Sequence, residues 1–72
     1  MMRLILSGHV RYRLMIRDLG ESDLEEIMRR KQKPSRDKDG NPIYRGVVRG
    51  IAVAVVIRAG SQPPFVITVY LD

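Results

Sequence analysis

Cysteine and tryptophan are absent from this sequence, and histidine occurs once in its 72 residues. Without cysteine the chain can form neither disulfides nor thiolate zinc sites, and a single histidine leaves zinc without a second imidazole, so we expect no metal and no other cofactor. The longest apolar run, Ile51–Ile57, is too short to span a membrane. The N-terminus reaches Gly8 and His9 too soon for a signal peptide, which favours a cytoplasmic protein without a membrane partner.

The length predicts a single domain over residues 1–72, and the 44% of hydrophobic residues can supply its core. A chain this small gains from additional burial, so a homodimer is one alternative. Thirteen Lys and Arg against eight Asp and Glu give a net charge of +5. That charge favours polyanionic partners, with nucleic acid first and an acidic protein second. A merely solvated basic surface explains the same composition equally well.

The β-branched run Ile51–Ile57 predicts a buried central strand, with further strands at Ile43–Val48 and Phe65–Leu71. Arg49-Gly50 predicts a two-residue hairpin turn between the first two of these strands. The segment Arg3–Leu6 is a short strand candidate. We therefore expect an α+β fold in which two N-terminal helices pack on one face of a three- to four-stranded antiparallel sheet.

The hairpin turn fixes which side chains share a face of the predicted sheet. The core face is expected to carry Tyr44, Val48, Ile51, Val53, Val55, Ile57, Phe65, Ile67, Val69 and Leu71. The other face, which we call the open face, is expected to carry Ile43, Arg45, Val47, Ala52, Ala54, Val56, Arg58, Val66, Thr68 and Tyr70.

Two helices are predicted before the sheet. Ser7 is a suitable N-cap for a helix over about 8–18, with Gly20 as its terminator. A capping box of Ser22 and Glu25 predicts the start of the second helix. The apolar positions expected to face the core are Val10, Tyr12, Leu14 and Ile16 in the first helix, and Leu24, Ile27 and Met28 in the second.

The segment Lys33–Pro42 is predicted to be a loop because it is polar and rich in turn-forming residues. Asp37, Asp39 and Asn41 supply oxygens at calcium-loop spacing. However, Gly40 is misplaced for such a loop and no glutamate closes a cycle of about twelve residues. The pattern indicates a turn leading into a strand.

His9, Arg13 and Arg17 are spaced by four residues, so they share one side of the first predicted helix, with Arg11 nearby. Their guanidinium groups could clamp phosphates, and the imidazole could act as a base. A solvated helix side, balanced by acids of the second helix, explains the same spacing. A lone histidine is also more often a packing residue than a catalytic one.

On the open face, Arg45, Arg58 and Tyr70 surround two small residues, Ala52 and Ala54. Arginines and a tyrosine on an exposed sheet suit RNA that is held by its backbone and stacked bases. The small alanine surface equally suits dimerisation. Both interpretations remain open at the level of the sequence.

The order of several short motifs resembles a family of short prokaryotic proteins of unknown function with a His-x-x-x-Arg helix. That family is similar to the RelE/barnase-type toxin ribonucleases. The motifs that carry the resemblance are His9 with Arg13, Met15, Arg17 and Leu19, then Ser22–Ile27, Asp37–Gly40, Tyr44–Gly46 and Thr68–Tyr70. The stretch Arg17–Gly20 departs from the family pattern at the end of the first helix. The resemblance implies a sheet whose open face holds RNA, and an antitoxin protein as a partner.

The resemblance also implies functional residues, namely His9 and Arg13 on the helix and Arg45 and Tyr70 on the sheet. We predict a metal-independent endoribonuclease or an RNA-interacting protein, in which His9 deprotonates a ribose 2′-OH and Tyr70 stacks or donates a proton. Arg13 and Arg45 would stabilise the charge on phosphorus. The expected RNA-binding residues are Arg11, Arg17, Arg45 and Arg58. The alternative is a non-catalytic nucleic-acid- or protein-binding domain. Catalysis requires His9 to lie at the sheet edge.

Overall fold

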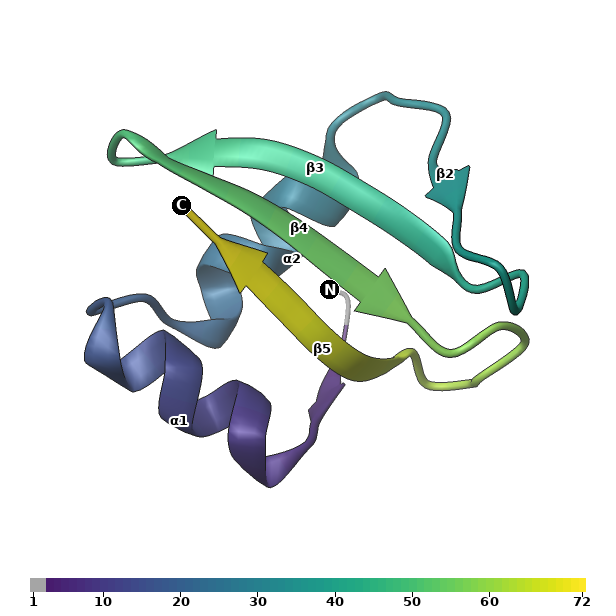
Figure 1. Cartoon of the computed structure of the whole chain (residues 1–72), viewed down its shortest axis with the longest axis horizontal. Coiled ribbons are helices and arrows are strands. Elements are labelled where there is room, and N and C mark those ends of the chain that lie inside the picture. Colours follow the sequence, from purple (N-terminus) through teal and green to yellow (C-terminus); the bar gives the residue numbers. More distant parts are fainter. Residues whose placement is uncertain (1–2) are drawn as a thin grey trace.

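The computed structural model describes residues 3–72, so the first two residues of the expected domain lie outside the described residues. The fold is α+β, as predicted, with both helices preceding the three long strands (Figure 1). No helix within residues 3–72 combines the length and the apolar character needed to cross a membrane. The elements in chain order are β1 (Ile5–Leu6), α1 (Gly8–Ile16), α2 (Glu21–Arg29), β2 (Ser35–Arg36), β3 (Pro42–Val48), β4 (Ile51–Ile57) and β5 (Phe65–Leu71).

The sheet has five strands in the order β1-β5-β4-β3-β2, and β1 runs parallel to β5. The expectation of three or four purely antiparallel strands was therefore wrong in strand number and in direction. β1 lies within Arg3–Leu6, the segment expected as a short strand, whereas β2 was not expected, because a strand of two residues is too short for an alternating pattern to reveal. β2 lies within the segment predicted as a loop. The three long strands are antiparallel, as expected.

The hairpin between β3 and β4 has the predicted register, with Val48 opposite Ile51 and Gly46 opposite Val53. Its two turn residues, Arg49 and Gly50, have φ angles of 48° and 81°. Two consecutive positive φ values are characteristic of a type I′ turn, whose twist matches that of the flanking strands. The turn chemistry alone therefore fixed the faces of β3 and β4.

A bulge between β4 and β5 changes the predicted face of the first residues of β5. Val55 lies opposite Val69, but Ile57 lies opposite Val66, so the alternation slips by one residue. Val66 is consequently fully buried on the core face. The prediction that Phe65 and Ile67 face the core and Val66 the open face was wrong for this reason.

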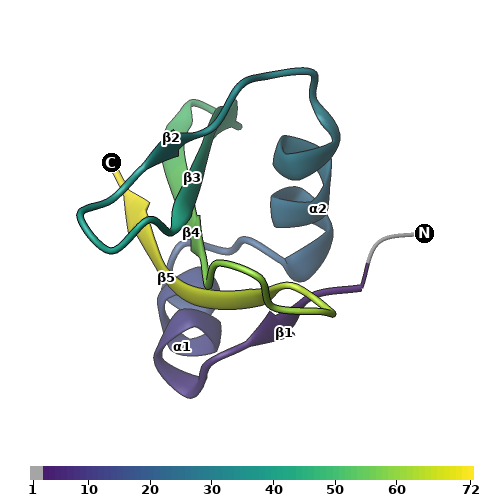
Figure 2. The same ribbon diagram turned by 90° about the vertical axis from the view of Figure 1, so that its right-hand side faces the viewer.

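The core is formed between the sheet and both helices. α2 contributes Leu24 and Ile27, which are fully buried. α1 contributes only Val10 and Leu14, because it lies along the β5 edge rather than across the sheet (Figure 2). The expectation that Tyr12 and Ile16 also face the core was wrong. The buried cluster comprises Leu4, Leu6, Val10, Leu14, Leu19, Leu24, Ile27, Val48, Val53, Val55, Ile57, Val66 and Val69.

The link between the helices lies two residues earlier in the chain than predicted, at residues 17–20. α1 begins after its predicted N-cap, Ser7, but ends at Ile16. Asp18, with φ of 56°, takes the left-handed position, and the Leu19 N–H donates to the Leu14 carbonyl over 2.8 Å. These are the features of a Schellman motif, so the terminator is Asp18 rather than Gly20.

Gly20 is instead the N-cap of α2, which begins two residues earlier than predicted. The Asp23 carboxylate accepts a hydrogen bond from the Gly20 N–H over 2.9 Å, and the Asp23 N–H donates to the Gly20 carbonyl over 3.0 Å. The reaching-back role expected of Glu25 therefore belongs to Asp23. The prediction of Ser22 as the N-cap was wrong.

Candidate nucleic-acid interface on the open sheet face

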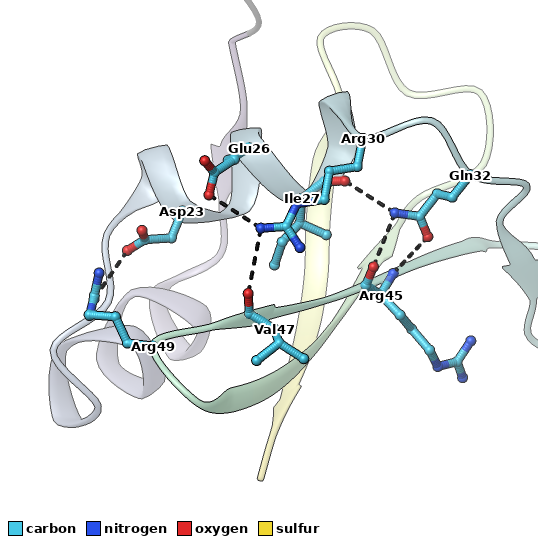
Figure 3. Close-up of polar contacts among 8 residues, drawn as sticks. All are labelled: Asp23, Glu26, Ile27, Arg30, Gln32, Arg45, Val47 and Arg49. Carbon is cyan, nitrogen blue, oxygen red and sulfur yellow. Dashed lines mark hydrogen bonds and ion pairs between the residues drawn. The ribbon is translucent and has the colours of Figure 1, made fainter.

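The open face is the side of β3, β4 and β5 that points away from α2. One row of neighbouring residues crosses it from Arg45 on β3 through Ala54 on β4 to Tyr70 on β5. In Figure 3, the side chains of Arg45 and Val47 point away from α2. The sequence prediction for this row was correct because it depends on the hairpin and on the part of β5 beyond the bulge.

A shallow depression of about 360 Å³ lies along this row. Its floor is low because Ala52 and Ala54 have the smallest side chains on β4, whereas Tyr70 and Val47 rise beside it and are 59% and 57% exposed. The lining residues are Arg45, Gly46, Val47, Ala52, Val53, Ala54, Tyr70 and Asp72. The depression thus combines a guanidinium group and an aromatic ring with a small apolar floor.

The two arginines expected on this face lie in different surroundings. Arg45 is exposed, and one nitrogen of its guanidinium group, Nη1, donates a hydrogen bond to the Ser35 hydroxyl of β2. The other nitrogens of the group do not take part in this hydrogen bond. Arg58 follows the end of β4, and its guanidinium carbon lies 4.5 Å from the centre of the Phe65 ring. The bulge makes this cation–π contact because it takes Phe65 out of the core. The contact of the half-buried Phe65 with Arg58 was not predicted for the same reason.

His9 lies at the edge of β5, where it joins α1 to the open face. Its Nε2 is 3.2 Å from the Thr68 hydroxyl, and its Nδ1 is 3.4 Å from the Ser7 hydroxyl. Thr68 shares the open face with Tyr70, two residues further along β5. The requirement that His9 lie at the sheet edge is met. Both of these neighbours are hydroxyl groups, so a carboxylate partner such as that of a Ser-His-Asp triad is absent from these contacts.

Arg13 and Ser7 cover the backbone of the same edge. The Arg13 guanidinium donates to the Val69 carbonyl over 3.2 Å, and the Ser7 hydroxyl donates to the Ile67 carbonyl over 3.5 Å. β1 pairs with β5 only at residues 65 and 66. At residues 67 and 69, where no strand within residues 3–72 lies beside this edge, the Ser7 and Arg13 side chains bind the backbone carbonyl groups instead. The four-residue spacing of His9 and Arg13 thus has a structural explanation alongside the functional one.

Among residues 3–72, no contact brings Arg11 or Arg17 to the open face. Arg17 is the exposed C-cap residue of α1. Arg11 lines a different hollow, of about 320 Å³, together with Met15, Asp18 and Glu21. Three residues were predicted to share one side of the helix. His9 and Arg13 contact β5, whereas Arg17 lies just beyond Ile16, the last residue of α1.

In the turn between β2 and β3, the Asp37 side chain forms hydrogen bonds with other residues of the same turn. The Asp37 carboxylate accepts hydrogen bonds from the backbone N–H groups of Asn41 and Asp39 over 2.8 and 2.9 Å, and from the Asn41 amide over 3.1 Å. These hydrogen bonds lower the pKa of Asp37, with that from the Asn41 backbone the strongest. Among residues 3–72, no three His, Asp or Glu side chains gather in a group that could hold a metal ion.

No protein-family model, curated protein or solved structure matches this chain. The resemblance to the toxin-like family therefore stays a prediction from the sequence.

Proposed function

We propose that this chain is an RNA-interacting protein that holds single-stranded RNA across its open sheet face. The observation that supports the proposal most strongly is the row Arg45–Ala54–Tyr70, which places a cation and an exposed aromatic ring on either side of a small residue. Single-stranded RNA offers both phosphates and unstacked bases, so one strand can use both groups.

Each group in the row has a distinct part in binding. The Tyr70 ring would stack on a base, a contact that is worth about 1–3 kcal/mol in single-strand complexes. The Arg45 guanidinium would donate to a phosphate in a forked geometry. The floor formed by Ala52 and Ala54 lets the sugar–phosphate backbone approach the sheet. The net charge of +5 favours the encounter at low salt.

The test is titration of a fluorescently labelled mixed-sequence RNA of about twelve nucleotides, followed by anisotropy at several salt concentrations. We expect Arg45→Ala and Tyr70→Ala each to weaken binding about tenfold. Arg29→Ala removes the same charge from the exposed end of α2 and serves as the matched control. If Arg29→Ala weakens binding as much as Arg45→Ala, the charge alone drives association and the proposed interface is wrong.

Ribonuclease activity is a second candidate, which the 3.2 Å approach of His9 Nε2 to Thr68 favours because it brings the imidazole to the rim of the open face. In this reaction His9 takes the proton of a ribose 2′-OH, and the 2′ oxygen attacks the adjacent phosphorus. The bond from phosphorus to the 5′ oxygen of the next nucleotide breaks, and that oxygen takes a proton from Tyr70. The products are a 2′,3′-cyclic phosphate and a 5′-hydroxyl.

Incubation of RNA with the protein in chelator tests this second candidate. We expect cleavage to be lost in His9→Ala, while binding stays within about twofold of wild type because His9 lies at the rim rather than in the row. If the wild-type protein binds RNA tightly but leaves it intact, the result supports the binding function. The same result excludes cleavage by the protein on its own. Absence of both, with a concentration-dependent dimer, would favour the alanine surface as a homodimer contact.

A further inference from the structure

No strand of the described residues, 3–72, lies beside the outer edge of β3 over part of its length. β2 pairs with β3 only at Ser35–Ile43 and Arg36–Pro42. Further along β3, alternate residues direct their backbone groups away from β4, as the hairpin register requires. Ala52, opposite Val47, exchanges both of its backbone hydrogen bonds with Asp72 of the β5 end instead. The backbone groups of Arg45 and Val47 therefore point outward.

A side chain takes the place of the missing strand. The Gln32 amide donates to the Arg45 carbonyl over 3.1 Å and accepts from the Arg45 N–H over 3.0 Å (Figure 3). These two hydrogen bonds are the pair that a residue of an added strand would exchange with Arg45. Next along the edge, the Arg30 guanidinium donates to the Val47 carbonyl over 3.5 Å.

The two sheet edges differ in how firmly they are covered. At β5, the side chains that meet the edge come from α1 and its N-cap, whose Val10 and Leu14 anchor the helix in the core. At β3, the Arg30 side chain is 44% exposed. Its hydrogen bond to the Val47 carbonyl is long, at 3.5 Å, and the same guanidinium group also forms an ion pair with Glu26 at 3.5 Å. Arg30 and Gln32 meet the β3 edge through side-chain groups alone, so both can leave it without moving the buried core.

The surroundings of the β3 edge are basic. Arg30 and Lys31 precede Gln32, and Lys33 follows it, all exposed to solvent. Arg45, on the edge itself, also has an exposed side chain. This distribution disfavours a second copy of the same edge, because two such edges would bring like charges together. It favours a negatively charged strand.

We propose that the β3 edge binds an extended acidic segment of a partner protein as an additional strand, which displaces the Gln32 amide from Arg45. Addition of a strand to an exposed sheet edge draws its affinity from backbone hydrogen bonds and its specificity from alternate side chains. The residue opposite Arg45 would share the open face with its guanidinium, so it is a carboxylate. The residue opposite Val47 would share the same face and is apolar.

The probe is the blocked peptide Thr-Thr-Val-Thr-Glu-Thr-Thr, in which an antiparallel strand with glutamate opposite Arg45 places valine opposite Val47. Its matched control has lysine in place of glutamate. We expect the protein to bind the glutamate peptide at least tenfold more tightly than the lysine peptide. In ¹⁵N spectra, saturation should shift the amide signals of Arg45 and Val47 and release the Gln32 side-chain amide. RNA is absent from the experiment, so its outcome is independent of the proposed function.

Three variants test the position of the added strand. Gln32→Ala removes the competing amide, and we expect it to bind the peptide about fivefold more tightly, the equivalent of one hydrogen bond. Val47→Pro removes an outward N–H from an edge position that tolerates proline, and we expect loss of binding. Val47→Ala shortens the same side chain but keeps the N–H, so it is the matched control, and we expect it to bind the peptide at least tenfold more tightly than Val47→Pro.

Equal binding by Val47→Pro and Val47→Ala, or equal affinity for the two peptides, would overturn the proposal. Because Gln32 also donates to the Ile27 carbonyl over 3.1 Å, unfolding of Gln32→Ala is checked by circular dichroism. If that variant is unstable, the comparison of the two Val47 variants decides alone. Dimerisation of Gln32→Ala without peptide binding would assign the edge to a second copy and also overturn the proposal.

Discussion

Gly46 of β3 lies so close to Ile27 of α2 that a Cβ atom on residue 46 would be 2.9 Å from Ile27 Cγ1. The same Cβ would be 2.9 Å from Arg30 Nη1, the flexible end of an exposed side chain. Ile27 is fully buried and cannot move away as the arginine can. The missing side chain at residue 46 therefore sets the distance between α2 and the sheet.

We expect Gly46→Ala to lower the free energy of unfolding by about 1–3 kcal/mol, the usual cost of overpacking a core. Gly8→Ala is the matched control, because a Cβ at Gly8 meets no atom within 4 Å and alanine favours the helix that begins there. Urea denaturation of both variants measures the difference. A Gly46→Ala protein as stable as wild type would contradict the close approach.

The corrected start of α2 leads to a second prediction. Asp23→Ala removes the carboxylate that accepts from the Gly20 N–H and faces Arg49 at 3.5 Å, so we expect a loss of about 1 kcal/mol. Ser22→Ala changes the exposed neighbouring residue and should cost less than about 0.5 kcal/mol. Thermal unfolding of the two variants distinguishes them. The reverse order would restore Ser22 as the N-cap.

The lowered pKa of Asp37 makes stability depend on pH at the acidic end. The pKa of this carboxyl is below its ordinary value of 3.8 in the folded chain, chiefly because the Asn41 N–H binds the carboxylate. The unfolded chain then binds more protons between the two pKa values, so this contribution is present above pH 3.8 and is lost as pH falls through the folded pKa.

Asp37→Asn tests this dependence because it keeps an oxygen acceptor but cannot ionise. We expect the stability difference between wild type and Asp37→Asn to shrink as the pH is lowered from about 6 to about 2, measured by urea midpoints. Other carboxylates titrate in both proteins and cancel in the difference. A difference that does not change with pH would mean that the turn does not depend on the charge of Asp37.

Tyr70 has two roles that a pair of variants can separate. Tyr70→Phe keeps the aromatic ring and removes the hydroxyl, whereas Tyr70→Ala removes both. If Tyr70 binds RNA by stacking, Tyr70→Phe should bind within about twofold of wild type and Tyr70→Ala about tenfold more weakly. If the hydroxyl donates a proton in cleavage, Tyr70→Phe should bind normally and cleave at least about a hundredfold more slowly. Anisotropy and gel assays measure the two quantities.

The parts of the fold that were predictable from the sequence depend on local chemistry. Arg49-Gly50 identified the hairpin because a glycine in a two-residue turn allows the positive φ that it requires. The bulge could not be found in the same way, since Val66 and Ile67 are both apolar and β-branched. The sequence also offered two capping pairs two residues apart, and Gly20 with Asp23 prevailed over Ser22 with Glu25.

The surroundings of the candidate site depend on long-range pairing. His9 meets Thr68 because the parallel pairing of Ile5 with Phe65 brings the start of α1 to the β5 edge. Arg3–Leu6 was expected as a short strand, but so short a segment does not indicate which strand it pairs with, so the position of His9 at the β5 edge could not be predicted. Gln32 was missed because a glutamine in a basic stretch has no pattern that marks it as a substitute for a strand.

The parallel contact between β1 and β5 also sets an order of events during synthesis of the chain. α1 meets the sheet through β5, so Val10 and Leu14 have no β5 surface to cover until residues 65–71 have been made. Until then the hairpin of β3 and β4 can pack against α2, but the apolar side of α1 stays exposed to solvent. Chains that are truncated before residue 65 should therefore expose the apolar side of α1 to solvent and be more prone to aggregate or to bind chaperones than the full chain.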